Sequence, residues 1–235
     1  MRFRTLFIIL GVICMGMWLT RCSWTHTVRY RMTVEVETPQ GLRTGSSVRE
    51  VADYTPWPIP MLGEARGGSG LAGGEAVAVD LPGGRVLFAL LTGADGVDYA
   101  ALLPAYHMGW LSPEGIVQGP VPLWPNTLLT VSRARGAAAA PMLVTFTNLR
   151  DPASVVRVDP ANLSAQFGEG VRLRRITVQV TEDDVTEGIE ERLDNVFWRR
   201  WGSRHQEELD NGVIDNPYFQ SLPGTLTRND FVIGD

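Results

Sequence analysis

The stretch VRYRMTVEVETPQGLRTGSSVREVADY, residues 28–54, decides the fold. Its first ten residues alternate apolar with charged or polar side chains. This is the two-residue period of a strand with one buried and one solvated face. Residues 38–41, TPQG, are typical of a tight turn. Residues 42–54 can return as a second strand, so the stretch predicts a β-hairpin.

Strands are also predicted further along the chain. The clearest signal is a second hairpin, in which residues 75–81 and 85–91 flank the turn Pro82-Gly83-Gly84. Its second arm is apolar on both faces, which indicates a central strand that is covered on both sides. The remaining strands are expected at residues 127–133, 142–148 and 171–181.

Three segments have helical character. Asp159 and Pro160 suit the N-cap and first turn of a short helix that Gly168 closes. Apolar residues recur at helical spacing from Val185 onward, which predicts a longer amphipathic helix over residues 185–201. Residues 95–107 suit another short helix.

These patterns together predict an α+β fold: a mostly antiparallel sheet of about six or seven strands, with two or three helices packed on one face. A transmembrane or signal helix is expected to precede it. Residues 55–74 are rich in Pro and Gly and predict a long irregular loop. The expected organisation is a signal anchor or signal peptide at 1–24, an α+β domain at 25–201, and a polar extension at 202–235 that packs on or trails the domain.

The N-terminal residues, MRFRTLFIILGVICMGMWLTRCSW, place the rest of the chain at or across a membrane. Arg2 and Arg4 precede an uncharged run at residues 5–20, which would span about 24 Å as a helix at roughly 1.5 Å per residue. This is short of the roughly 30 Å hydrocarbon core, but a flanking arginine can snorkel. Three interpretations are open: an uncleaved signal anchor, a lipoprotein signal with an acylated Cys22, and a cleaved secretory signal.

The signal anchor is the favoured interpretation. No small-x-small cleavage site follows the apolar run, and Arg21 stands directly before Cys22, where a lipobox has a small residue. The basic residues before the run favour a cytoplasmic N-terminus, although Arg29 and Arg31 lie on the other flank. We therefore expect the domain on the periplasmic side of the inner (cytoplasmic) membrane, close to its surface because the first strand begins almost directly after the anchor.

Composition excludes several classes of function. All 21 basic residues are arginine, so no P-loop or Schiff-base lysine exists. The three arginines before Cys22 leave 18 arginines against 26 acidic residues in the rest of the chain, a net charge of −8. Such a domain is a poor candidate for binding nucleic acid. Cys14 and Cys22 are the two cysteines, so the domain itself has no disulfide and no thiolate zinc site.

No catalytic or cofactor motif is found, and neither a cofactor nor a metal is expected. The three histidines are far apart, and His107, which follows Asp95, Asp98 and Tyr106, is the best single candidate for proton transfer. A partly buried structural role is the more common one for a lone histidine. The acidic cluster at residues 182–191 fails EF-hand spacing and is interpreted as a solvated face.

One aromatic and basic cluster is a candidate for partner contact, because stacking and ion pairing can bind a protein, a headgroup or an acidic glycan. Its residues are Trp198, Arg199, Arg200 and Trp201. In the alternative interpretation, Phe197 and one of the tryptophans pack inward, and the arginines pair with Asp194 or Glu208.

Four blocks carry a resemblance: YRMTVEVETPQGLRTGSSV at 30–48, GEAVAVDLPGGRVLFALL at 74–91, TFTNLRDPASVVRVDP at 145–160 and FGEGVRLRRITVQVTEDDVTEGIEERL at 167–193. Together they resemble a family of uncharacterised proteobacterial proteins that are membrane-anchored or exported. The resemblance implies an envelope setting. It brings no activity, cofactor or catalytic residue.

Two classes of function follow. The first is a membrane-anchored envelope protein whose domain is a non-catalytic interaction or accessory module of a larger assembly. The second is a membrane-tethered hydrolase with a site near His107 and the Pro- and Gly-rich loops. The missing motifs favour the first class. The expected partners are the membrane, through the N-terminal helix, and a protein of the envelope.

Overall fold

The computed structural model describes residues 24–55, 68–93, 100–101, 103, 121–122, 140–211 and 216–234. The strands are β1 (Trp24–Thr38), β2 (Gly41–Thr55), β3 (Gly68–Glu75), β4 (Val77–Leu81), β5 (Arg85–Gly93), β6 (Val121–Pro122), β7 (Pro141–Phe146), β8 (Val155–Arg157), β9 (Arg172–Val180) and β10 (Val232–Ile233). The α-helices are α4 (Ser164–Phe167), α5 (Asn195–Asp210) and α6 (Leu222–Thr225). Short 3-10 helices are η1 (Pro152–Ser154), η2 (Ile189–Glu191), η3 (Pro217–Gln220) and η4 (Arg228–Asp230).

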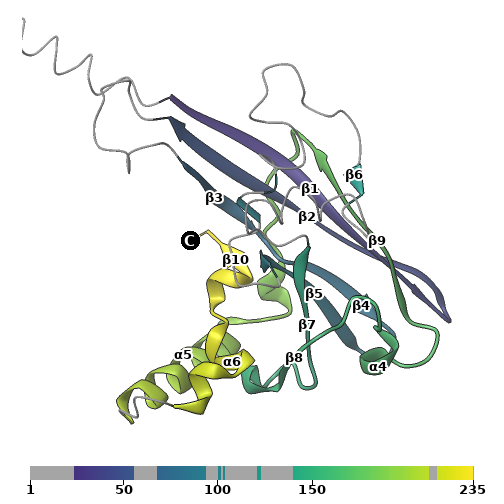
Figure 1. The fold of residues 1–235 in the computed structure, drawn as a ribbon, viewed down its shortest axis with the longest axis vertical. Helices are drawn as coiled ribbons and strands as arrows, with labels where there is room; N and C mark the ends of the chain where they lie inside the picture. The colour runs from purple at the N-terminus through teal and green to yellow at the C-terminus, as the bar shows by residue number, and fades with distance from the viewer. Residues whose placement is uncertain are drawn as a thin grey trace, which may run out of the picture.

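The described strands form two sheets, with α5 and α6 gathered at one end of the molecule (Figure 1). The larger sheet has the order β10-β3-β2-β1-β9-β6 and the smaller β4-β5-β7-β8, and every pairing is antiparallel. The predicted α+β class with antiparallel pairing is therefore confirmed. The predicted single sheet is wrong. A strand that is apolar on both faces needs a layer on each side, and for β5, in the smaller sheet, the larger sheet supplies one of them.

The first predicted hairpin is confirmed as β1 and β2. Their register runs without a break from Thr38↔Gly41 to Trp24↔Thr55. On its other side β1 pairs with β9, so β1 is an interior strand. The inward residues of β1, Tyr30, Met32, Val34 and Val36, are completely buried.

The fold has three layers, and β5 lies in the middle one. Leu87 and Ala89 face the larger sheet and belong to the core between the two sheets. Val86, Phe88 and Leu90 point the other way, into a second core that α5 and the C-terminal residues complete. This alternation confirms the prediction that the second arm of the PGG hairpin is covered on both faces.

The C-terminal residues take part in the second core. Leu226 and Phe231 are buried there, and β10 adds an edge strand to the larger sheet by pairing with β3. The backbone N–H of Ala76 also donates to the carbonyl oxygen of Phe231 over 2.6 Å. The polar segment after residue 202 therefore contributes buried apolar side chains at its end.

The Pro- and Gly-rich loop predicted at residues 55–74 is partly wrong, because β3 begins at Gly68. This glycine-rich strand, GSGLAGGE, has low intrinsic strand propensity. It is held as a strand by β2 on one side and β10 on the other. Residues 56–67 lie outside the described residues.

The longer predicted helix is displaced. The chain forms η2 and then α5, which begins at Asn195 and continues to Asp210. Helix α5 starts there because the Asp194 carboxylate accepts the N–H of Phe197 over 2.8 Å. In the part of the chain that the structure describes, none of the helices has the length and apolarity to span a bilayer.

The short helix α4 also starts later than predicted. Its first residue is Ser164, because the Asp159 carboxylate accepts the N–H of Ala161 and closes a turn instead of capping a helix. The end at Gly168 is confirmed, with a φ of 99° that favours glycine.

Three predicted elements lie wholly or largely outside the described residues: the N-terminal helix, the strand at 127–133 and the helix at 95–107. Of the last, residues 100, 101 and 103 are described, and all three are helical. The strands predicted at 142–148 and 171–181 are confirmed as β7 and β9.

The two sheets approach each other closely at Gly45 in β2. A Cβ built there would lie 2.1 Å from the carbonyl oxygen of Ala78 in β4, far inside contact distance. We expect Gly45→Ala to push the sheets apart and lower the free energy of unfolding by about 1–3 kcal/mol. Chemical denaturation followed by tryptophan fluorescence measures this. The matched control is Gly70→Ala in β3, where a Cβ meets nothing within 4 Å; an equal loss in both variants would contradict the steric account.

Candidate functional site

The structure splits the predicted partner-contact cluster between core and surface. Trp198 and Trp201 are only 9% and 5% exposed and stack on each other with ring centroids 6.0 Å apart. The Trp201 indole N–H donates to the Pro223 carbonyl oxygen over 2.9 Å. Arg199 and Arg200 are exposed. The tryptophans thus attach α5 to the smaller sheet, while the arginines remain available at the surface.

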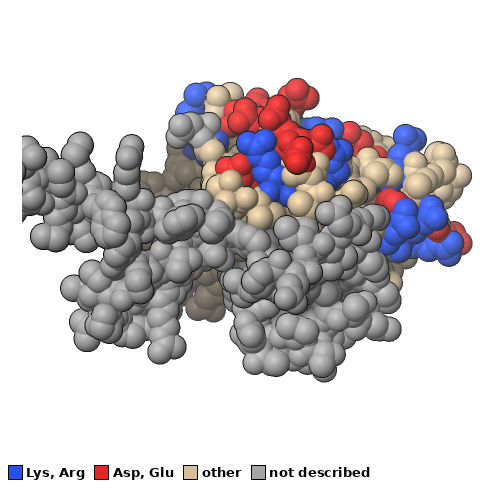
Figure 2. Space-filling model, turned by 90° about the horizontal axis from the view of Figure 1, so that it is seen from above, with Lys and Arg blue, Asp and Glu red and all other residues tan. Residues whose placement is uncertain are grey.

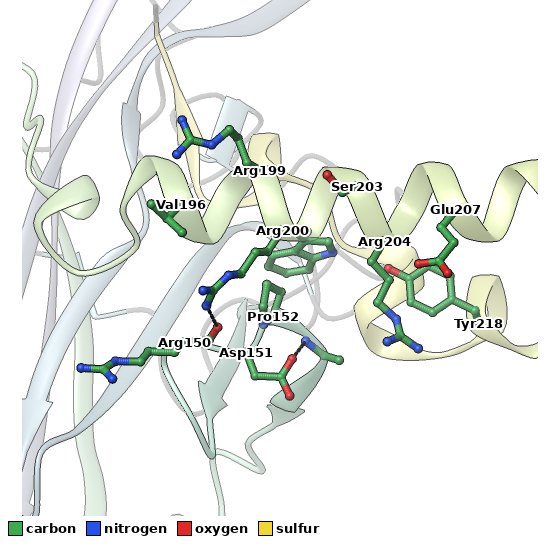
Figure 3. Close-up of a pocket in the computed structure, with 12 residues that line it drawn as sticks. Arg150, Asp151, Pro152, Val196, Arg199, Arg200, Ser203, Arg204, Glu207 and Tyr218 are labelled. Carbon is green, nitrogen blue, oxygen red and sulfur yellow. Dashed lines mark hydrogen bonds between the residues drawn. The ribbon is translucent and has the colours of Figure 1, made fainter.

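A groove lies between α5 and the turn that leads into η1, and we call it the arginine groove. Its volume is 670 Å³. Figure 3 shows α5 along one side and the turn with Pro152 along the other. The residues that matter for its chemistry are Arg150, Val196, Arg199, Arg200, Arg204 and Tyr218.

Helical periodicity brings two of these arginines to the same side of α5. Arg200 and Arg204 are four residues apart, so they lie one above the other on the helix. The Arg200 guanidinium donates to the Arg150 carbonyl oxygen over 3.1 Å (Figure 3). This bond connects α5 to the opposite wall of the groove.

Tyr218 closes the far end of the groove. Its ring lies 5.7 Å from the Arg204 guanidinium carbon, and its hydroxyl donates to the Pro223 carbonyl oxygen over 3.2 Å. Burial raises the pKa of the Tyr218 hydroxyl, although the positive charge of Arg204 acts in the opposite direction.

The arginine groove is locally basic in a chain whose net charge is −5. Its lining holds four arginines but two carboxylates, Asp151 and Glu207. The Asp151 carboxylate is already engaged, because it accepts the N–H of Ala153 over 3.0 Å and caps η1. Four guanidinium groups against two carboxylates leave the lining with an excess of positive charge, and the groove can bind an anionic group.

The polar faces of β1 and β9 differ from the groove, because their arginines are paired. Arg29 contacts Glu50 at 2.6 Å and Asp184 at 3.3 Å, and Arg175 contacts Glu35 at 2.6 Å. Seen from above, acidic and arginine side chains lie directly beside one another on the described surface (Figure 2). Such pairs neutralise each other and leave little net charge for a ligand.

The acidic cluster at residues 182–191 is exposed, although it lies before α5 and not on a long helix. Asp183 pairs with Arg31. A hydrogen bond from the Thr181 hydroxyl, with help from Arg31, lowers the pKa of the Asp183 carboxyl. Among the described residues, no group of three or more His, Cys, Asp or Glu side chains could hold a metal ion.

The two other candidate residues, His107 and Cys22, lie outside the described residues, so neither role is tested. His205 is described and is half-buried against the aromatic rings of Tyr218 and Phe219, at centroid distances of 5.9 and 5.0 Å. Its environment is that of a packed aromatic residue.

Comparison with known proteins gives no relative, since the chain matches no family model, no curated protein and no solved structure at a significant level. The candidate site is therefore identified from the geometry of the structure alone.

Sequence reasoning found two of the groove arginines, Arg199 and Arg200, and missed Arg150, Arg204 and Tyr218. Arg204 could have been found, because it lies four residues after Arg200, if the helix had been continued through Gly202. Arg150 and Tyr218 reach the groove from distant parts of the chain, and no local pattern indicates that.

Because the pKa of Tyr218 is raised in the folded protein, the free energy of unfolding decreases as the pH becomes alkaline. The folded protein holds the phenolic proton more tightly than the unfolded chain, so this stabilisation is present below about pH 10 and is lost as the pH rises through the folded-state pKa. We expect Tyr218→Phe to flatten the fall in unfolding free energy above about pH 10. Urea denaturation across this range measures the slopes; identical slopes would contradict the prediction.

Proposed function

We propose that this chain is a membrane-anchored envelope protein whose domain, on the periplasmic side, acts as a non-catalytic interaction module of a larger assembly. The observation that carries the proposal is the arginine groove, an open surface groove with excess positive charge on an acidic protein. Interfaces favour arginine because its planar guanidinium pairs bidentately with carboxylates and stacks on aromatic rings.

Two sequence features support the placement. The uncharged run at residues 5–20 suits a signal anchor, and the four blocks quoted above resemble exported or membrane-anchored proteobacterial proteins. The hydrolase alternative depends on His107, and none of the described residues supplies a further catalytic group that supports it.

Membrane attachment is the first test. If residues 5–20 are an anchor, the full-length protein should stay in the membrane fraction after carbonate and high-salt washes, because apolar burial is insensitive to charge screening. Cys22→Ser should change neither fractionation nor apparent mass. Under the lipoprotein alternative, Cys22→Ser leaves an unprocessed precursor of higher mass. Recovery of a soluble wild-type protein that lacks its N-terminal segment would contradict both forms of anchoring.

Site-specific cross-linking tests the interaction itself. A photoreactive amino acid at Ser203, which lines the groove, should give a discrete cross-linked product with another protein in intact cells. The matched control is the same amino acid at Leu42, which is 47% exposed at the tip of the first hairpin. The product is detected by its shift in electrophoresis. No discrete product from Ser203, or the same product from both positions, would count against an interaction through the groove.

A further inference from the structure

Among the described residues, three of the four groove arginines have no carboxylate partner. Arg204 lies 3.6 Å from Glu208. Among the described residues, Arg150 and Arg199 contact no carboxylate, and Arg200 donates to a neutral carbonyl oxygen. On β1 and β9, by contrast, arginines face glutamate or aspartate. The groove thus presents guanidinium groups that a carboxylate of another molecule can pair with.

The backbone from which these cations project is held in place. Three of them project from α5, and that helix is immobilised by Phe197, Trp198 and Trp201 in the second core. Arg150 lies on the opposite wall, in a turn closed by the Asn148 and Asp151 side chains. A ligand therefore meets guanidinium groups on a preformed scaffold, and less backbone order has to be created on binding.

The arrangement suits an extended ligand with several negative charges better than one small anion. Figure 3 shows Arg200 and Arg204 projecting from α5 toward the turn with Pro152, Arg150 extending outward from the opposite wall, and Arg199 on the other side of the helix, so the guanidinium groups do not converge on a single spot. A phosphate or sulfate site needs donors that converge on one centre. Carboxylates spaced along a polypeptide can each meet a different arginine.

Apolar surface lies between the charges. Val196 is 42% exposed, and Pro152 and the Tyr218 ring also line the groove. A peptide can place apolar side chains or backbone against these groups while its carboxylates pair with the arginines, as in the mixed surfaces of protein interfaces.

The position of the groove argues against a lipid headgroup. Helix α5 lies at the opposite end of the molecule from the start of β1 (Figure 1). If the chain is anchored through the residues before β1, the groove is held away from the bilayer to which the protein is attached.

We infer that the arginine groove binds an acidic segment of another protein, whose carboxylates pair with Arg150, Arg200 and Arg204. This inference rests on the proposed interaction function and specifies the chemistry of the partner. Arg200 and Arg204 lie on the groove side of α5 and are the residues to test.

The test uses the full-length protein in nanodiscs of zwitterionic lipid and a fluorescein-labelled peptide of alternating glutamate and serine. Fluorescence anisotropy should show binding of this peptide and about tenfold or more weaker binding of the same peptide with glutamine for glutamate. Arg200→Gln/Arg204→Gln should weaken binding of the glutamate peptide by about tenfold or more. The matched control is Arg43→Gln/Arg172→Gln, which removes the same charge from exposed positions outside the groove and should change binding less than about twofold.

Four results would overturn the inference. The first is an equal loss of binding in both double variants, which indicates non-specific attraction. The second is equal binding of the glutamate and glutamine peptides. The third is that phosphatidylglycerol vesicles bind through Arg200 and Arg204 whereas the peptide does not. The fourth is salt-sensitive self-association of the wild type that Arg200→Gln/Arg204→Gln abolishes, which assigns the groove to a second copy.

The two proposals can fail separately. A discrete cross-link from Ser203 without binding of the glutamate peptide leaves the interaction function standing and removes the acidic partner. Peptide binding in vitro without any cross-link in cells supports the chemistry of the groove and counts against the proposed function.

Discussion

The packing of the two sheets depends on the hydrogen bonds that the buried guanidinium of Arg49 donates. Arg49 is completely buried in β2, and burying a charge is costly unless it is hydrogen-bonded. It donates to the carbonyl oxygens of Glu75 in β3 over 3.0 Å and of Ala89 in β5 over 3.2 Å. One side chain thus joins the larger sheet to the smaller one. Gly74 lies so close that a Cβ there would be 2.9 Å from the Arg49 Cα.

Glu75 connects Arg49 to the segment that leads into the candidate site. Its carboxylate accepts the N–H groups of Gly188 and Ile189, each over 2.7 Å, and so holds the segment that leads into α5. Asp194 then caps the helix, and Trp198 and Trp201 pack it onto the smaller sheet. The direction of α5 places Arg200 and Arg204 opposite the turn at Arg150. The groove is therefore a consequence of the same buried polar contacts that hold the sheets together.

Local patterns predicted most of the strands. Strict alternation predicted β1, and the PGG turn predicted the hairpin of β4 and β5, because both signals depend only on neighbouring residues. The glycine-rich β3 was missed because its pairing comes from β2 and β10, at distant positions in the chain. The start of α5 was misplaced because apolar spacing continues through Val185 and Ile189, whereas in the structure the Glu75 carboxylate accepts the backbone N–H groups of Gly188 and Ile189 ahead of the helix.

The sequence by itself determined the α+β class, the antiparallel hairpins, the acidic charge, the absence of lysine, and the candidate status of Arg199 and Arg200. These follow from periodicity and composition, which are local or summed properties. The tertiary structure alone decided that the strands divide into two sheets, that both tryptophans of residues 198–201 are buried, and that Arg150 and Tyr218 join the arginines of α5. Those outcomes depend on which distant segments satisfy one another's buried polar groups and apolar faces, and a linear pattern does not record such pairings.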